Sequence, residues 1–197
     1  MSTHYRALFE QACPAVDAGD HPRAERLLRE LLAQRPGHPE SLHILGVICA
    51  QSGRPDEGIP FIRQAVALKP YFFEARANLG AALVATLRSA EAIVVLRELL
   101  ALKPDHAPSH HNLGRALHQQ GAYAHAVAAY ARAAQLQPDF ADAHLWRGIA
   151  FMDLGESDAA LDALRLAVAR QPDSSEARHA LANLLREIGR IPDALAL

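Results

Sequence analysis

The chain has 197 residues, and it is poor in cysteine and in net charge. Cys13 and Cys49 are its only cysteines, and they form neither a CxxC pair nor a zinc-ligand pattern. The sequence therefore predicts two reduced, packed thiols. The formal net charge is -2 and the sequence pI is about 6.6. This near-neutral balance gives no general attraction to nucleic acid or to anionic lipid, so we expect neither as a partner.

Long hydrophobic runs are also absent. No uncharged stretch approaches the ~18 residues that a membrane-spanning helix needs. The N-terminal sequence MSTHYRALFE has no cationic region followed by an apolar region, as a secretory signal would. These absences predict a protein that does not enter a membrane, and a cytoplasmic location is the default expectation.

Motifs for catalysis and cofactor binding are missing as well. The sequence contains no GxSxG, P-loop, HExxH or dinucleotide-binding glycine motif. Its 11 histidines invite a metal hypothesis, but His111 and His118 would lie about 10 Å apart along a helix, too far for one ion. The carboxylates are scattered and form no convergent pair. We therefore expect no enzyme activity, no cofactor and no metal site.

What the sequence does contain is a repeat. Five prolines recur at a spacing of 34 residues, and four glycines keep the same spacing in a second phase: Pro36, Pro70, Pro104, Pro138 and Pro172, and Gly46, Gly80, Gly114 and Gly148. Two residue types with one period indicate a tandem array. If each repeat begins seven residues before its glycine, repeats one to six cover residues 5–38, 39–72, 73–106, 107–140, 141–174 and, in part, 175–197.

Each repeat predicts two helices joined by a short turn. In repeat four, apolar or small residues fall at helical spacing in both halves, and Gly121 separates the halves. Pro138 ends the second helix, because a proline disfavours the α conformation in the residue before it. One helix pair cannot bury its apolar face alone, so neighbouring pairs must stack. We predict an all-α protein without strands, folded as a single α-solenoid of stacked antiparallel helix pairs over residues 1–197.

The repeats resemble those of the tetratricopeptide repeat (TPR) family, whose 34-residue unit has small or apolar residues at set positions and a proline near its end. Position 7 is Leu45, Leu79, Leu113 and Leu181, position 8 is the glycine named above, and position 20 is Ala24, Ala92, Ala126, Ala160 and Ala194. The resemblance covers residues 5 to 197. It implies a right-handed superhelix in which the first helix of each repeat, helix A, lines the concave surface and the second, helix B, lines the outer one. Small residues at positions 8 and 20 predict a close crossing of the two helices.

Two departures from the pattern predict local irregularities. Leu87 replaces the turn glycine of repeat three, so we expect a different turn geometry, centred on Arg88 and Ser89. Pro60 predicts a late start or a bend in helix B of repeat two.

At the C-terminus, helix A of repeat six is intact, but helix B has only begun when the sequence stops. One explanation is that the chain is a fragment of a longer protein. The alternative is self-association through an exposed C-terminal helix face formed by Leu181, Leu184, Leu185 and Leu195.

Residues on one face of the helices A predict a binding groove. We expect it to be lined by His43, Val47, Asn78, Ala81, His111, Asn112, Arg115, His118, Gln119, Leu145, Ile149 and Met152. This wall is small and apolar in repeats two and three, polar and cationic in repeat four, and apolar again in repeat five. Such a groove suits an extended peptide or a partner helix. The alternative is that short side chains only permit tight curvature.

Asn78 and Asn112 occupy position 6 of adjacent repeats, and an amide can bond a peptide backbone irrespective of its side chains. They resemble the asparagine ladder of O-linked N-acetylglucosamine transferases, although Trp146 breaks the series in the next repeat. Two functions therefore stay open. The first is a non-catalytic protein-interaction module or scaffold that binds a peptide or helical segment in the groove. The second is the N-terminal recognition arm of a larger glycosyltransferase-like or sulfotransferase-like enzyme, whose repeats these resemble.

Overall fold

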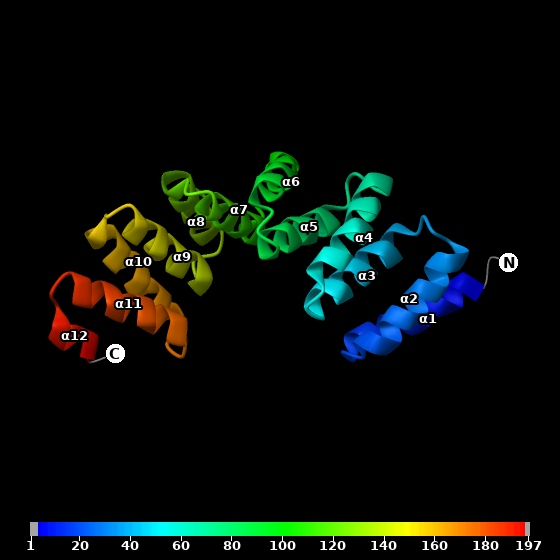
Figure 1. Cartoon of the computed structure of the whole chain (residues 1–197), viewed down its shortest axis with the longest axis horizontal. Helices are drawn as coiled ribbons and strands as arrows, with labels where there is room; N and C mark the ends of the chain where they lie inside the picture. Colours follow the sequence, from blue (N-terminus) through cyan, green and yellow to red (C-terminus); the bar gives the residue numbers. More distant parts are fainter. Residues whose placement is uncertain (1–3, 196–197) are drawn as a thin grey trace. The chain divides into compact units, whose positions relative to one another are not determined.

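A computed structural model of the chain describes residues 4–195 and, over that range, contains twelve helices and no strand (Figure 1). This confirms the predicted all-α fold. Residues 1–3 and 196–197, which the predicted solenoid includes, lie outside the described residues. None of the described helices combines the length and the apolar character of a membrane-spanning segment.

The chain divides into two compact units, Met1–Arg88 and Ser89–Leu197, the N-terminal and C-terminal units. The N-terminal unit contains α1 (His4–Asp17), α2 (His21–Gln34), α3 (Pro39–Gln51), α4 (Pro55–Leu68) and α5 (Phe73–Ala85). The C-terminal unit contains α6 (Ser89–Leu102), α7 (Ala107–Gln119), α8 (Tyr123–Leu136), α9 (Ala141–Asp153), α10 (Ser157–Arg170), α11 (Ser175–Glu187) and α12 (Ile191–Leu195). The continuity of a single solenoid through both units stays a prediction.

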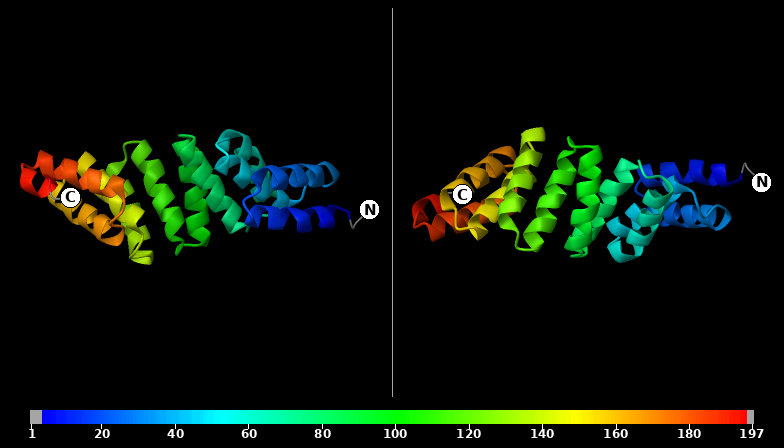
Figure 2. Two further views of the ribbon diagram at one scale, coloured as in Figure 1. Left: turned by 90° about the horizontal axis from the view of Figure 1, so that it is seen from below. Right: turned by 90° about the horizontal axis from the view of Figure 1, so that it is seen from above.

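Within each unit the helices pack in chain order, as Figure 2 shows from two sides. Helix A packs on helix B of the same repeat in α1 and α2, α3 and α4, α7 and α8, and α9 and α10. Each helix B also packs on the helix A that follows it, as α2 does on α3 and α8 on α9, and successive helices A touch, as α3 and α5 do. The repeat pattern predicts this arrangement, in which each helix pair contacts only nearby repeats.

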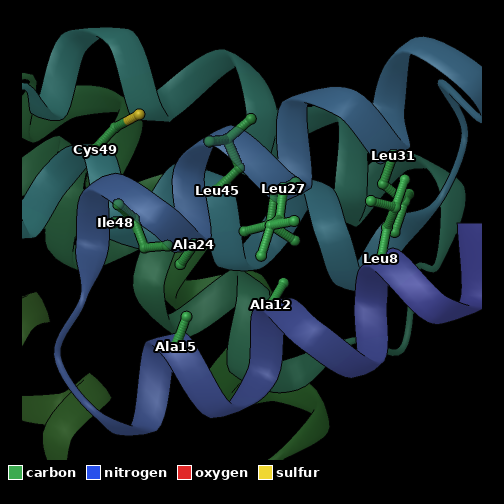
Figure 3. Close-up of a cluster of buried hydrophobic side chains, with 10 residues drawn as sticks. Leu8, Ala12, Ala15, Ala24, Leu27, Leu31, Leu45, Ile48 and Cys49 are labelled. Atoms are coloured by element: carbon green, nitrogen blue, oxygen red, sulfur yellow. The ribbon is translucent and has the colours of Figure 1, made fainter.

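The core of the N-terminal unit lies between α1, α2 and α3 (Figure 3). Its side chains come from all three helices: Leu8, Ala12 and Ala15 from α1, Ala24, Leu27 and Leu31 from α2, and Leu45, Ile48 and Cys49 from α3. All are less than a tenth exposed, and burying one leucine side chain contributes about 2 kcal/mol. The first repeat therefore packs on its neighbour although Pro14 lies inside α1.

Glycine at position 8 provides the space in which helix A crosses helix B. A Cβ added to Gly148 would lie 2.6 Å from Cγ of Leu164, and a Cβ added to Gly114 would lie 2.6 Å from Cε1 of Tyr130. Leu164 and Tyr130 both occupy position 24, and both are fully buried. The predicted close crossing is confirmed, and the side chain at position 24 fills the space that the missing Cβ leaves.

The expectation of a different turn at Leu87 is wrong. Leu87 has a φ of 58°, and Gly121, at the same repeat position, has a φ of 72°. The N–H of Leu87 donates to the oxygen of Val84 at 3.1 Å, and the N–H of Arg88 donates to the oxygen of Leu83 at 2.9 Å. Gly121 and the residue after it donate the same two bonds, which define a Schellman motif. The turn geometry is thus kept at a residue with a Cβ, which costs about 1 kcal/mol.

Two further expectations are corrected. Helix α4 begins at Pro55, so the late start expected from Pro60 is wrong. At the other end of the chain, α11 and the start of α12 confirm the predicted helices of repeat six, but the expected exposed leucine face is wrong for three of its four members. Leu181, Leu184 and Leu185 are 4%, 1% and 3% exposed, because they pack against α9 and α10; Leu195 is 84% exposed.

Leu87→Gly is expected to stabilise the protein, because glycine adopts a positive φ without steric cost and the 74% exposed Leu87 side chain gives up little burial. We expect a gain of about 0.5–1 kcal/mol in the free energy of unfolding, measured by urea denaturation followed by circular dichroism. Leu154→Gly is the matched control, since Leu154 caps α9 with a φ of -86°, and it should destabilise. A less stable Leu87→Gly would contradict the assigned turn.

Gly148→Ala is expected to destabilise the C-terminal unit by about 1–3 kcal/mol, because the added methyl group would overlap Leu164 and lie 3.3 Å from the carbonyl oxygen of Ala160. The same denaturation experiment measures it. Gly37→Ala is the control, since its Cβ would meet only Leu68 at 3.9 Å. Equal stabilities for the two variants would show that α9 and α10 do not cross as closely as described.

Candidate functional site

A groove of about 310 Å³ lies in the N-terminal unit, between α3 and α5. Of the residues expected from the sequence, Val47, Asn78 and Ala81 line it. Most of the remaining wall is apolar, and it consists of Ala50, Gln51, Pro55, Ile62, Ala82 and Ala85.

The expected site residues include none of these six, and a reason can be given for five of them. Ala50, Gln51 and Ala85 occupy positions 12 and 13, which share a helical face with position 9, so the 3.6-residue period could have identified them. Pro55 and Ile62 come from α4, a helix B, and a pattern that assigns the groove to the helices A carries no signal for them.

Asn78 is held in place by His43. The amide nitrogen of Asn78 donates to Nε2 of His43 over 2.8 Å. Burial lowers the pKa of His43, so its ring is neutral near pH 7 and Nε2 accepts the bond. His43 is 5% exposed, and its ring packs edge-on against Phe72 with centroids 4.8 Å apart. The bond uses the amino group of Asn78, so its carbonyl oxygen remains an acceptor for a ligand.

The placement of position 5 in the groove is corrected. His43, His111 and Leu145 all occupy this position, and all are buried, His111 at 8% and Leu145 at 2% exposure. The ring of His111 lies 5.0 Å from that of Phe140 and 5.6 Å from that of Tyr130. These side chains therefore support the wall of helix A from inside the repeat and do not form its open surface.

In the C-terminal unit, α7 and α9 together build an aromatic and charged cluster. The guanidinium carbon of Arg115 lies 5.7 Å from the ring centroid of Trp146, and the His118 ring stands edge-on to the same ring at 5.9 Å. Nε2 of His118 donates to Oδ2 of Asp153 over 2.7 Å. Tyr123, at the start of α8, also contacts the His118 ring, with centroids 5.1 Å apart. All five residues are at least partly exposed, so a ligand can reach the cluster.

Two members of this cluster were not expected from the sequence. Trp146 stands at position 6, where sequence reasoning takes it only as a break in the asparagine series. Asp153 follows His118 by one repeat plus one residue, so the period alone could have placed the two side chains on adjacent helices.

The remaining expected residues surround the cluster. Asn112 is partly exposed and Gln119 is exposed, and both share the side of α7 that carries Arg115 because they lie three residues before it and four after it. Ile149 and Met152 are partly exposed and pack against the core around Leu145. The described surface of α7 and α9 thus places Arg115 among aromatic, apolar and amide side chains.

One group of potential metal ligands occurs among the described residues: Glu25, Cys49 and Glu57 lie within 4.8 Å of one another. Both carboxylates are already paired, Glu25 with Arg54 at 2.6 Å and with Arg29 at 2.8 Å, and Glu57 with the same two arginines. Hydrogen bonds from the two guanidinium groups lower the pKa of Glu25, and burial raises the pKa of Cys49. The arrangement is an ion-pair network that links α2 to α4.

Sequence models of one family match nearly the whole chain. Models described as tetratricopeptide repeat match residues 9–71, 50–117 and 141–184, and a model described as TPR repeat matches residues 114–155. The chain belongs to the tetratricopeptide repeat family. No curated protein matches it by sequence.

Solved structures share the fold. MamA from Desulfovibrio magneticus RS-1, residues 41 to the end, aligns with a TM-score of 0.80 at 20% identity over 87% of this chain and 97% of that chain. A thermophilic TPR protein from Thermus thermophilus aligns with a TM-score of 0.67 at 27% identity over 80% and 87%. YrrB, a TPR protein with an unusual peptide-binding site, aligns with a TM-score of 0.75 at 18% identity over 91% and 98%. These likenesses confirm the α-solenoid fold class.

Acid is expected to destabilise the C-terminal unit through His111. Burial, aided by the positive charge of Arg115, lowers the pKa of His111 to about 4 from its ordinary 6.5. Between these values the unfolded chain binds a proton that the folded chain does not, so the free energy of unfolding falls as the pH drops from 6.5 towards 4. The loss due to His111 should approach about 3 kcal/mol at pH 4.

Urea denaturation at a series of pH values measures this loss. His111→Leu, which installs the residue found at the same position of repeat five, should flatten the pH dependence, whereas His125→Gln at an exposed position should not. An unchanged pH dependence in His111→Leu would remove His111 as its source.

Proposed function

We propose that this TPR protein is a non-catalytic interaction module that binds a polypeptide segment along the open faces of its helices A. The observation that carries the proposal is the groove between α3 and α5, because it combines an apolar wall of small side chains with amide groups at Gln51 and Asn78. Its volume of about 310 Å³ is roughly twice that of an apolar cavity that holds a benzene ring. One large apolar side chain of a ligand therefore fits.

The polar groups suit a peptide backbone. The carbonyl oxygen of Asn78 accepts from a backbone N–H, and the Gln51 amide both donates and accepts. Because His43 fixes the Asn78 side chain, little side-chain entropy is lost when the ligand binds. Apolar pockets for side chains next to amides for the main chain are a recurring means of peptide recognition.

The shared fold supports the same class of ligand, since YrrB is described as having a peptide-binding site. Catalysis fits this surface poorly, because an open groove does not exclude water from a reacting group. The alternative, a recognition arm of a larger enzyme, is favoured by no observation in the described residues.

Ala81→Phe is expected to block the groove, because Ala81 lies in its wall and a phenyl ring would occupy the space of the ligand side chain. A display library of random 12-residue peptides selected on the wild-type chain supplies the probe. Peptides that the wild type enriches should bind Ala81→Phe at least tenfold more weakly in fluorescence anisotropy titrations.

Ala67→Phe, at an exposed position of α4 in the same unit, is the control and should bind like the wild type. If no peptide is enriched, the proposed function fails. Wild-type affinity of every selected peptide for Ala81→Phe would show that this groove is not the binding surface.

A further inference from the structure

We propose that the C-terminal unit binds an acidic side chain of its polypeptide ligand through Arg115. This inference rests on the proposed function and names one chemical feature of the partner. It concerns the surface that α7 and α9 form around Trp146.

Arg115 differs from the paired arginines of the described chain. Arg29, Arg54 and Arg190 each form an ion pair with a carboxylate. Arg115 is partly buried, and the contact that the structure shows for its guanidinium group is the Trp146 ring. A partly buried charge that lacks a counter-ion is stabilised when an anion arrives, because the desolvation cost of the cation has already been incurred.

The carboxylates of α9 do not form an ion pair with Arg115. Asp153, at the C-terminal end of the helix, accepts the hydrogen bond from His118. Asp142 lies at the other end of the helix. The two are eleven residues apart, about 16 Å along the helix. The middle of the α7 and α9 surface, where Arg115 lies, is therefore left with an unmatched positive charge.

Trp146 holds the guanidinium group in a form that suits a carboxylate. A guanidinium that lies over an aromatic ring uses its face for the cation–π contact, while its N–H donors lie in its plane. Two of these donors can bind both oxygens of a carboxylate at once. Asn112 and Gln119, on either side of Arg115 along α7, add amides that can bond the main chain of the same ligand.

The cation–π contact singles out Arg115, and one guanidinium group binds one carboxylate at a time. The chain carries a net charge of -2, which gives no general attraction to the successive phosphates of a nucleic acid. The partner is accordingly a polypeptide that presents an aspartate or glutamate side chain.

Trp146 makes the surface directly observable, because it is the only tryptophan of the chain. Peptides selected on the wild type and lacking aromatic residues would be synthesised with an amidated C-terminus, so that only side chains supply carboxylates. Titration should change the Trp146 emission in a saturable manner. Replacing the peptide glutamate by glutamine should weaken binding to the wild type about tenfold, and added salt should weaken it as well.

A double-mutant cycle assigns the contact. Arg115→Gln should also lose about tenfold in affinity for the acidic peptide, and the glutamine peptide should then bind wild type and Arg115→Gln equally. Arg132→Gln is the matched control, since it removes the same charge from an exposed position of the same repeat on α8, and it should leave the affinity unchanged.

The outcomes separate the two proposals. Selection that yields no binding peptide overturns the proposed function. Selected peptides that show no preference for Asp or Glu, or whose preference survives Arg115→Gln, overturn this inference and leave peptide binding intact. Binding that depends on a free C-terminal carboxylate and not on an acidic side chain also overturns it.

Discussion

The fold depends on one contact, the packing of the side chain at position 24 of helix B against the glycine at position 8 of helix A. Leu164 over Gly148 and Tyr130 over Gly114 are two examples. In repeat two the crossing is closer still, because position 20 is also a glycine and Gly46 and Gly58 lie backbone to backbone. This contact fixes how helix A is rotated about its axis, and the rotation decides which positions are buried and which face a ligand.

That rotation explains the division of roles along helix A. Position 5 faces inward, so His43 and His111 are buried, and burial lowers the pKa of both rings. Positions 9 and 13 face outward. At position 9, Val47 and Ala81 line the groove of the N-terminal unit and Arg115 lies over Trp146. Position 6 lies at the edge between the two sets, which is why Asn78 can bond a buried histidine and line the groove at once.

Periodicity predicted the helices and their pairing, because most repeats present glycine, alanine and leucine at the same positions to the same neighbours. It could not predict the turn at Leu87. Leucine disfavours a positive φ, but the hydrogen bonds at the end of the helix keep Leu87 in that conformation. The site was predicted in part. A helical wheel places position 5 next to position 9, and only the packing of an aromatic ring such as Phe140 over it shows that it is buried. The contact between Arg115 and Trp146 joins two helices, and no pattern within one repeat contains it.

The structure separates residues that stabilise the array from residues that give it specificity. Positions 8, 20 and 24 pack inside each repeat, and a change there alters the geometry of the whole hairpin. Position 9 is valine in repeat two, alanine in repeat three and arginine in repeat four, and these side chains rest on the same framework of buried contacts. A side chain at position 9 can change without disturbing the helix crossing beneath it. One scaffold can therefore carry an apolar groove in one repeat and a cationic side chain in another. The difference between Val47 and Arg115 therefore affects which ligand binds. Replacing Gly148 by a larger residue instead affects the stability of the fold.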